Sequence, residues 1–337
     1  MTDHRYQELA VVGAGSWGTA LAVLLAPRFE HVRLWVYEAD LAGRMAATRV
    51  NDVFLPDSRL PENVRVSTSF EEVLGGAQIV LGVMPSAHAR RTYKTMLPFL
   101  DPAMLFVSAT KGIENGTLLR MTQVVEEVAG ARFEPRVGAL SGPTFAKEVA
   151  RGEPAAVAIA SKDRPLASDV QAAFSGPSFR LYTNDDIVGV ELGAALKNVI
   201  AIGAGICHGL GLGNNTMAAL ITRGLAEITR LAVAMGGRPK TLAGLAGLGD
   251  LVLTCTGALS RNRQLGMELA KGRKLDEILA SMRMVAEGVE TTTAAVDLAR
   301  LHGVEMPIAE QMYAILKLGR PPQEAIRELM ERSLKGE

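Results

Sequence analysis

A short apolar run that leads into a glycine-rich turn constrains the fold of this 337-residue chain more than any other feature. Leu9–Val12 has the composition of a buried strand, residues 13–18 read GAGSWG, and Thr19–Ala26 is a helical run of small and apolar residues. In this strand–turn–helix order, GxGxxG is the fingerprint of a dinucleotide-binding βαβ unit. The sequence therefore predicts an N-terminal Rossmann-type domain that binds NAD or NADP.

Each of the three glycines has a predicted role in that turn. Gly13 permits the tight bend, Gly15 lets the backbone approach a pyrophosphate, and Gly18 lets the helix pack on the strand. The amides at the helix start then face the phosphates. A merely structural glycine turn is the alternative, and the combination of strand, helix and position disfavours it.

The end of the second predicted strand bears on the choice of coenzyme. The strand ends in Tyr37-Glu38, and Glu38 follows Gly13 by 25 positions, close to the spacing of about 20 residues at which an acid contacts the adenosine ribose. This spacing favours NAD, with a solvated glutamate at a helix start as the alternative. No arginine that would receive a 2′-phosphate stands at position 37 or 38, although Arg44 or Arg49 could fold back. The sequence leaves the choice between NAD and NADP open.

Strand and helix patterns divide the chain into two predicted domains, as its length also suggests. Apolar runs alternate with helical patterns up to about Tyr182, which is typical of a doubly wound α/β sheet, and only helical patterns follow from about Asp186. We therefore expect a Rossmann domain over residues 1–185 and an all-helical substrate and catalytic domain over residues 186–337. The predicted strands are Leu9–Val12, Val32–Tyr37, Gln78–Val83, Met104–Ser108, Arg136–Leu140 and Ala155–Ala160, and the predicted later helices are Ile187–Gly205, Thr216–Met235, Ser260–Lys271, Gly288–His302 and Pro307–Leu318.

Composition excludes several classes of protein. Lysine plus arginine equals aspartate plus glutamate at 36 each, so no global field recruits nucleic acid or an anionic membrane. Cys207 and Cys255 lack CxxC spacing, which predicts two buried thiols in a reducing cytoplasm and no metal site. No apolar signal region precedes the first strand, and the most apolar later stretch, Val199–Cys207, is too short to span a bilayer. We expect a cytoplasmic protein without membrane insertion.

Polar residues follow two of the later predicted strands. Lys111 comes shortly after Met104–Ser108, and residues 141–146, SGPTFA, follow the next strand. Ligands of open α/β sheets collect at the carboxyl ends of strands, where a lysine can meet an anion and a helix start can hold a phosphate. The alternatives are a surface lysine and an ordinary helix cap.

The helical part adds a second set of polar residues. Lys197 and Asn198 lie in an otherwise apolar helix, and because burying an unpaired ammonium is costly, the lysine must reach solvent, a partner or a substrate. Asp250, Thr254 and residues 260–262, SRN, supply a carboxylate, hydroxyls, a guanidinium and an amide. The guanidinium suits a phosphate, whereas a capped helix start with an exposed arginine is the alternative.

Taken together, eight motifs resemble the bacterial NAD(P)-dependent glycerol-3-phosphate dehydrogenase family, from about Leu9 to at least His302. They are GAGSWGTALA at 13–22, the LP-containing segment at 51–63, TKG at 110–112, LSGPTFAKEV at 140–149, ELGAALKNVIAI at 191–202, AALITRGLAE at 218–227, GLAGLGDLVLTCT at 244–256 and SRN at 260–262. The resemblance implies reversible hydride transfer between NAD(P)H and dihydroxyacetone phosphate, which gives sn-glycerol 3-phosphate for phospholipid synthesis.

The resemblance also assigns roles to residues. It implies that Lys197 transfers the proton, with Lys111, Asp250 and Thr254 around the reacting carbonyl, and that the site lies in a cleft between the domains. An ammonium can polarise the ketone oxygen and donate its proton as negative charge develops there. The implied substrate contacts are Lys111, Gly142, Thr144, Lys197, Asn198, Asp250, Ser260, Arg261 and Asn262, with Arg261 and Asn262 at the phosphate. The implied dinucleotide contacts beyond the glycines are Ser16, Trp17, Lys111, Ala146, Arg261, Val285 and Glu287.

Proton transfer in both directions requires a lysine whose pKa is lower than usual. The pKa of an ordinary lysine is about 10.4, so burial and the charges of Lys111 and Arg261 would usefully lower the pKa of Lys197, while Asp250 would oppose that shift.

The sequence departs from the family at Tyr37, where many members carry a basic residue, which puts NADP use in doubt. Two other functions are weighed against the main prediction. One is a different two-domain dehydrogenase, of the 3-hydroxyisobutyrate or 6-phosphogluconate type, and the other is a non-catalytic dinucleotide sensor. The apolar helices of the second domain could pack internally or across a homodimer interface.

Overall fold

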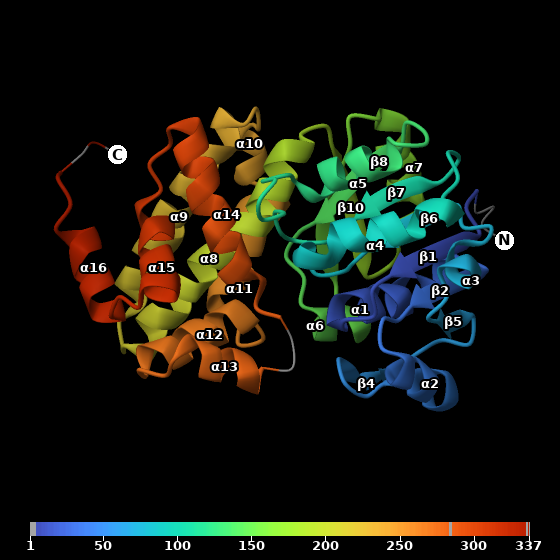
Figure 1. The fold of residues 1–337 in the computed structure, drawn as a ribbon, viewed down its shortest axis with the longest axis horizontal. Helices are drawn as coiled ribbons and strands as arrows, with labels where there is room; N and C mark the ends of the chain where they lie inside the picture. Colours follow the sequence, from blue (N-terminus) through green and yellow to red (C-terminus); the bar gives the residue numbers. More distant parts are fainter. Residues whose placement is uncertain (1–4, 283–284, 335, 337) are drawn as a thin grey trace.

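The computed structural model describes residues 5–282, 285–334 and 336. Figure 1 shows a sheet flanked by helices, which contains the N-terminus, beside a group of helices that contains the C-terminus. We call residues 8–184 the sheet part and residues 187–330 the helical part.

The main sheet has eight strands in the order β10-β9-β8-β7-β6-β1-β2-β5. The strands β8, β7, β6, β1, β2 and β5 are mutually parallel. Strand β9 pairs antiparallel with β8, and β10 pairs parallel with β9. A separate antiparallel pair, β3-β4, lies between β2 and β5 in the chain. The strands are β1 Glu8–Val12, β2 His31–Trp35, β3 Val50–Asn51, β4 Leu55–Arg59, β5 Val64–Ser67, β6 Ile79–Gly82, β7 Leu105–Ser108, β8 Arg136–Ser141, β9 Ala155–Ala160 and β10 Phe179–Asn184.

Helices cover both faces of this sheet, as the side chains of β1 show. Leu9 and Val11 belong to one apolar cluster, Ala10 and Val12 to another, and all four are buried. Successive side chains of a strand point to opposite faces, so a strand covered on both sides is apolar throughout. The helices are α1 Ser16–Leu25, α2 Ala39–Thr48, α3 Phe70–Leu74, α4 Ala89–Met96, α5 Met121–Ala129, α6 Ala146–Ala150 and α7 Arg164–Phe174.

The predicted Rossmann-type sheet is confirmed, with additions at its edges. All six predicted strands are present, but β2 ends at Trp35 because the chain turns outward at Tyr37, which is 67% exposed. The edge strands β5 and β10 were not predicted. In β10 the buried Phe179 and Leu181 alternate with exposed residues, so it lacks the continuous apolar run of a central strand.

The helical part is organised around α8, Ile187–Gly209, which is longer than predicted and almost entirely buried. Glycines let α12 cross it closely: a Cβ added to Gly205 would lie 2.0 Å from the carbonyl oxygen of Arg263, and one added to Gly266 would lie 2.0 Å from that of Ile202. No strand follows β10 in the described part of the chain. The remaining helices are α9 Asn214–Ala234, α10 Pro239–Leu242, a π-helical turn Leu245–Gly249, α11 Asp250–Thr256, α12 Arg261–Ala270, α13 Leu275–Ser281, α14 Glu287–His302, α15 Pro307–Leu318 and α16 Pro322–Met330.

Among the described residues, α8 alone is long and apolar enough to cross a bilayer, but 94% of its most apolar window is buried inside the protein. Its composition is therefore explained by its place in the core. Cys207 and Cys255 are free and buried, as predicted.

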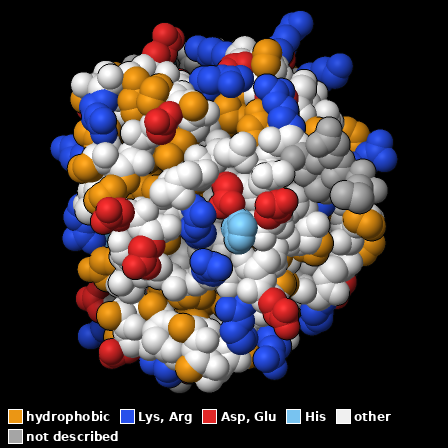
Figure 2. Space-filling view, turned by 90° about the vertical axis from the view of Figure 1, so that its right-hand side faces the viewer, with side chains coloured by type: hydrophobic (Ala, Val, Ile, Leu, Met, Phe, Trp, Pro, Cys, Tyr) orange, Lys and Arg blue, Asp and Glu red, His pale blue; other side chains and the backbone are white. Residues whose placement is uncertain are grey.

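The surface of the sheet part carries charges of both signs. Figure 2 shows the side of the molecule remote from the helical part, where lysine and arginine side chains lie among aspartates and glutamates. This face therefore presents no extended field of one sign.

Candidate active site

Asp250 is the centre of a buried polar cluster where the two parts meet. It is the first residue of α11 and is fully buried. The π-helical turn Leu245–Gly249, which lies within the motif at residues 244–256, leads directly into it. Its two carboxylate oxygens accept from different lysines, Oδ2 from Lys111 at 2.7 Å and Oδ1 from Lys197. We call Asp250, Lys111, Lys197 and Thr254 the Asp250 cluster.

Lys197 enters this cluster from the middle of α8 and is 4% exposed. Its Nζ donates to Asp250 and, at 2.8 Å, to Thr254 Oγ1, whose hydroxyl donates to the main-chain oxygen of Asp250 at 2.6 Å. The ammonium therefore does not snorkel to solvent, and it is paired.

Burial lowers the pKa of Lys197 to about 7, and the positive charge of Lys111 acts in the same direction. The negative charge of Asp250 opposes this shift. The predicted causes are thus present, except that Arg261 is not among the principal ones. A lysine with a pKa near neutrality can both donate and accept a proton at physiological pH.

Lys111 reaches the cluster from the loop after β7. Besides Asp250, its Nζ contacts the carbonyl oxygen of Gly142 at 3.1 Å and Thr144 Oγ1 at 3.5 Å. Both acceptors lie in the turn between β8 and α6, so the predicted carboxyl ends of two neighbouring strands do meet here.

A chain of amides connects this loop with α12 and α14. Asn198 Nδ2 donates to the main-chain oxygen of Lys111 at 3.5 Å, and Asn262 Nδ2 donates to Asn198 Oδ1 at 3.0 Å. Asn262 Oδ1 in turn accepts from the Gly288 amide at 2.9 Å. The two asparagines are thus brought together, and one N–H of Asn262 stays available because an amide nitrogen carries two.

The SRN residues lie at the start of α12. Ser260, predicted as the first helical residue, is instead the N-cap and accepts from the Arg263 amide at 3.3 Å. Arg261 donates through one Nη1 hydrogen to the carbonyl oxygen of Val285 at 3.0 Å. Burial lowers the pKa of the guanidinium, and the negative charge of Glu287 opposes this shift.

Glu287 links the helical part to the sheet part. It is the first residue of α14, and its Oε2 accepts from Ser86 Oγ, beyond the end of β6, at 2.8 Å. Burial raises the pKa of its carboxyl. A Cβ added to Gly112 would lie 2.4 Å from Ser86 Oγ. The chain at Gly112 therefore approaches the chain at Ser86 closely. The sequence analysis missed Ser86, and its position just after an apolar strand was the available signal.

The glycine turn has the geometry that its sequence predicts. Gly13 has φ +115°, and a Cβ on it would lie 2.8 Å from the Val83 carbonyl oxygen. A Cβ on Gly18 would lie 1.8 Å from the Gly13 carbonyl oxygen, whereas one on Gly15 would meet nothing within 4 Å. Gly15 is the N-cap of α1 and leaves the amides at the helix start without a side-chain cap. The open space at Gly15 and these amides fit a pyrophosphate.

Asn51 supports the glycine turn, and the sequence analysis did not single it out. Its side chain is fully buried; Nδ2 donates to the Ala14 carbonyl oxygen and to Thr19 Oγ1, both at 2.8 Å, and Oδ1 accepts from the Phe54 amide at 2.9 Å. Ser16 Oγ donates to the Phe54 carbonyl oxygen at 2.8 Å. Residues 51–54 therefore clamp the turn. The LP-containing motif that begins at Asn51 was the only signal.

Two further predicted dinucleotide contacts lie near this turn. Trp17 is partly buried in the first turn of α1, with an Nε1 that has no hydrogen-bond partner among the described residues. Ala146 begins α6, which packs against α1.

The residues considered for the adenosine end lie apart from the Asp250 cluster. Tyr37 and Glu38 are exposed, and Glu38 precedes α2 without capping it. Arg44 pairs with Asp52 at 2.9 Å, and Arg49 donates to the Leu60 and Pro61 carbonyl oxygens. Neither arginine folds back toward the end of β2.

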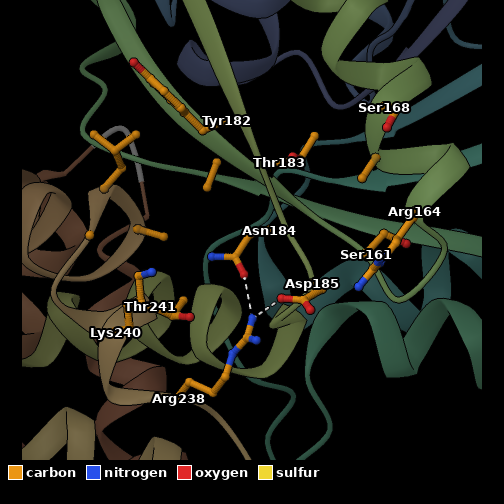
Figure 3. Close-up of a pocket in the computed structure, with 15 residues that line it drawn as sticks. Ser161, Arg164, Ser168, Tyr182, Thr183, Asn184, Asp185, Arg238, Lys240 and Thr241 are labelled. Carbon is orange, nitrogen blue, oxygen red and sulfur yellow. Dashed lines mark hydrogen bonds and ion pairs between the residues drawn. The ribbon is translucent and has the colours of Figure 1, made fainter.

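A groove elsewhere in the molecule contains none of the predicted site residues. It measures about 700 Å³ and lies where β10 and α7 approach the α10 region. Figure 3 shows Arg238, which precedes α10, reaching Asn184 and Asp185 at the end of β10. This exposed contact is a further connection between the two parts.

Comparisons with known proteins match both parts of the chain. The family model described as NAD-dependent glycerol-3-phosphate dehydrogenase N-terminus matches residues 8–167, and the C-terminus model matches residues 186–327. The chain belongs to this family. Among its glycerol-3-phosphate dehydrogenase relatives, a protein of Koribacter versatilis named glycerol-3-phosphate dehydrogenase [NAD(P)+] is 63% identical over 96% of this chain and 97% of its own length. One of Geobacter sp. with the same name is 53% identical over 98% and 99%.

The glycerol-3-phosphate dehydrogenase fold is also seen in solved structures. The crystal structure of glycerol-3-phosphate dehydrogenase from Coxiella burnetii superimposes with a TM-score of 0.93 at 41% identity, covering 97% of this chain and 99% of that one. The family predicted from the motifs is therefore confirmed and favoured over the other dehydrogenase types.

Proposed function

We propose that this protein catalyses reversible hydride transfer between NAD(P)H and dihydroxyacetone phosphate, which gives sn-glycerol 3-phosphate. The observation that carries the proposal is the Asp250 cluster, a buried lysine with a pKa near neutrality held beside a second lysine. This cluster lies at the junction of a dinucleotide-binding sheet and a helical part, and domain junctions commonly hold ligand sites. We place the domain boundary between residues 185 and 186, within the turn from β10 to α8.

The residues of the glycine turn fit a dinucleotide. The free space at Gly15 and the uncapped amides of α1 would hold its pyrophosphate, and a bound NAD(P)H supplies the hydride. Ser16, Trp17 and Ala146 flank this position. The lysines of the Asp250 cluster stabilise the negative charge that develops on the substrate oxygen.

Lys197 is the proton donor in ketone reduction. An ammonium carries three N–H donors, and two of them are engaged by Asp250 and Thr254. The third is available to the substrate oxygen, where it stabilises the developing negative charge and then transfers its proton. In the reverse direction the neutral amine accepts the hydroxyl proton.

Lys111 and Asp250 prepare that step. Lys111 Nζ already contacts three oxygens, so it acts through its charge rather than as a second proton donor. Its charge lowers the pKa of Lys197, and Asp250 holds both ammonium groups in place.

Arg261 and the start of α12 form the phosphate subsite. Within the part of the chain that the structure describes, one N–H of the guanidinium is committed, to Val285, and the other donors suit a bidentate phosphate contact. The free N–H of Asn262 and the hydroxyl of Ser260 add two donors, while Gly142 and Thr144 border the carbonyl end.

NADH is the preferred coenzyme. Arg44 and Arg49 are engaged elsewhere, and Glu38 suits the ribose hydroxyls while it repels a 2′-phosphate.

The reaction takes place in the cytoplasm and supplies glycerol 3-phosphate for phospholipids. A homodimer is the alternative to a monomer, and sedimentation velocity distinguishes the two.

The test is dihydroxyacetone phosphate-dependent oxidation of NADH and of NADPH, measured by absorbance for the wild type and for Lys197→Ala. Unphosphorylated dihydroxyacetone is the control. We expect turnover that requires the phosphate, that is faster with NADH and that is lost in the variant. Tight NADH binding without turnover would contradict the proposal and would favour the sensor.

A further inference from the structure

We propose that the buried ion pair of Arg120 and Glu191 is a positioning device for the reaction, because it fixes the loop that carries Lys111 to the helix that carries Lys197. The inference rests on the proposed function and extends it to two residues outside the Asp250 cluster.

The ion pair is buried, and both oxygens of the Glu191 carboxylate accept hydrogen bonds. Arg120 is 8% exposed, Glu191 6% and Thr122 1%. Glu191 accepts from the Arg120 guanidinium, from the Thr122 amide at 2.8 Å and from the Thr122 hydroxyl at 2.6 Å. Arg120 belongs to the sheet part and Glu191 to α8, so the pair joins the two parts. Removing one partner of such a pair leaves an uncompensated buried charge.

On the side of the sheet part, the pair anchors the Lys111 loop, residues 109–120. Ile113 and Arg120 form an isolated antiparallel bridge, and the Glu114 amide donates to the Leu119 carbonyl oxygen at 2.9 Å. Lys111 lies two residues before this bridge. A displacement of Arg120 therefore displaces the backbone next to Lys111.

The same loop is embedded in the helical part. Ile113 is 2% exposed and belongs to the apolar core of the helical part, and Asn115 Nδ2 donates to Glu290 Oε2 of α14 at 2.7 Å. The loop thus docks on the helices at several points, two of which are ion pairs, Lys111 with Asp250 and Arg120 with Glu191.

On the other side, α8 transmits the position of Glu191 to Lys197. The two residues are six positions apart on one continuous helix, an axial distance of about 9 Å at about 1.5 Å per residue. The ion pair and the contacts of Asp250 are therefore two attachments between the same loop and the same helix. Without the first, Lys111–Asp250 would be the remaining ion pair between the loop and the helical part, beside the hydrogen bonds of Asn198 and Asn115.

The test uses Glu191→Gln and the double variant Arg120→Met/Glu191→Gln. The amide of glutamine can still accept from Thr122, and the double variant leaves no buried unpaired charge, so it is expected to fold. The control is Arg238→Met/Asp185→Asn, which breaks the exposed contact of Figure 3 between the same two parts.

We expect both test variants to bind NADH within twofold of the wild type but to lose about 100-fold in kcat, since displacements of about 1 Å have effects of this size. The alkaline limb of the reduction rate should move to higher pH, because Lys197 no longer feels the full charge of Lys111. The control should keep the wild-type kcat and pH profile.

Wild-type kcat and pH profile in the folded double variant would overturn the proposal and leave the pair a purely structural role. If the wild type itself does not reduce dihydroxyacetone phosphate, the proposed function fails instead. In that case, a crystal structure of the double variant still tests whether the ion pair positions Lys111. The distance from Lys111 Nζ to Asp250 Oδ2, 2.7 Å in the wild type, should exceed hydrogen-bond length, and an unchanged distance would refute the inference.

Discussion

The side chain of Asn51 donates from Nδ2 to the carbonyl oxygen of Ala14 at 2.8 Å, inside the glycine turn that should hold the coenzyme pyrophosphate. Asn51→Ala would leave the Phe54 amide without its partner and would leave the Ala14 oxygen with the longer hydrogen bond from Thr19 Oγ1 at 3.3 Å. An unsatisfied buried group costs about 1–3 kcal/mol. Because the cost falls on the turn, we expect the Kd for NADH to rise by about 5- to 150-fold, measured by calorimetry, with little change in the KM for dihydroxyacetone phosphate.

Asn63→Ala is the matched control. Asn63 also donates to two main-chain oxygens of the sheet part, those of Ala26 at 2.8 Å and Phe29 at 2.9 Å, but it holds the far end of α1. This variant should lose stability and keep its NADH affinity. Equal losses of affinity in both variants would mean that Asn51 acts only through general stability.

The pKa of Lys197, lowered to about 7, predicts opposite pH dependence for the two directions of the reaction. Reduction requires the ammonium, so its kcat should fall as the pH rises through about 7. Oxidation requires the neutral amine, so its kcat should rise over the same range. Rates measured in both directions between pH 6 and about 11 check this. A limb near pH 10 would show that the amine titrates like an exposed lysine.

Asp250→Asn should lower kcat and shift the pH dependence of ketone reduction. The variant keeps the size of the side chain but removes the charge that raises the pKa of Lys197, so that pKa should fall below about 7. The alkaline limb of reduction should then move to lower pH, and kcat should drop about 100-fold or more, as for other lost preorganised contacts. Thr256→Ala, on the exposed side of the same helix, is the control. A loss of kcat without movement of the limb would argue against the electrostatic role of Asp250.

Tyr37→Arg should change the choice of coenzyme. The position is 67% exposed, so an arginine there is free to bind a 2′-phosphate, and charge-assisted hydrogen bonds contribute about 1.5–3 kcal/mol. We expect kcat/KM for NADPH to rise roughly tenfold or more relative to that for NADH, where tenfold corresponds to about 1.4 kcal/mol. Arg44→Ala should leave the wild-type ratio unchanged because Arg44 is paired with Asp52. A large loss of NADPH use in Arg44→Ala would show that Arg44 does fold back.

Sequence reasoning was most successful where one local pattern has one structural solution. The φ of Gly13 and the close approach at Gly18 follow from the glycine spacing, and α15 begins and ends where its apolar pattern predicts, at Pro307 and Leu318. The apolar helix around Lys197 predicted an ammonium that must reach solvent, a partner or a substrate. The partner itself was suggested only by family resemblance.

The features that were missed depend on contacts between distant residues. Nothing in the local pattern of Arg120 or Glu191 shows that they pair across 71 positions. Asn51 resembles an ordinary loop asparagine until the glycine turn folds against it. The edge strand β10 is half exposed, so its pattern is weaker than that of a central strand.

A buried carboxylate far from the Asp250 cluster predicts how stability varies with pH. Glu227, on α9, is 2% exposed and accepts from the Ile308 amide at 2.9 Å, at the start of α15. Burial raises its pKa to about 7. A folded-state pKa above the unfolded value of about 4.3 means that the protonated form stabilises the fold. This stabilisation is complete below about pH 4 and is lost as the pH rises through about 7.

Glu227→Gln tests this linkage because it keeps the acceptor and cannot ionise. In the wild type, the free energy of unfolding should lose about 3 kcal/mol from this group between about pH 4 and 8, and the variant should lack that loss. Denaturation by urea at several pH values measures it. Glu324→Gln, an exposed carboxylate on the first turn of α16, is the control and should retain the wild-type slope. Identical slopes in all three proteins would show that the Glu227 carboxyl is already ionised at acidic pH, held by the two amides at the helix start.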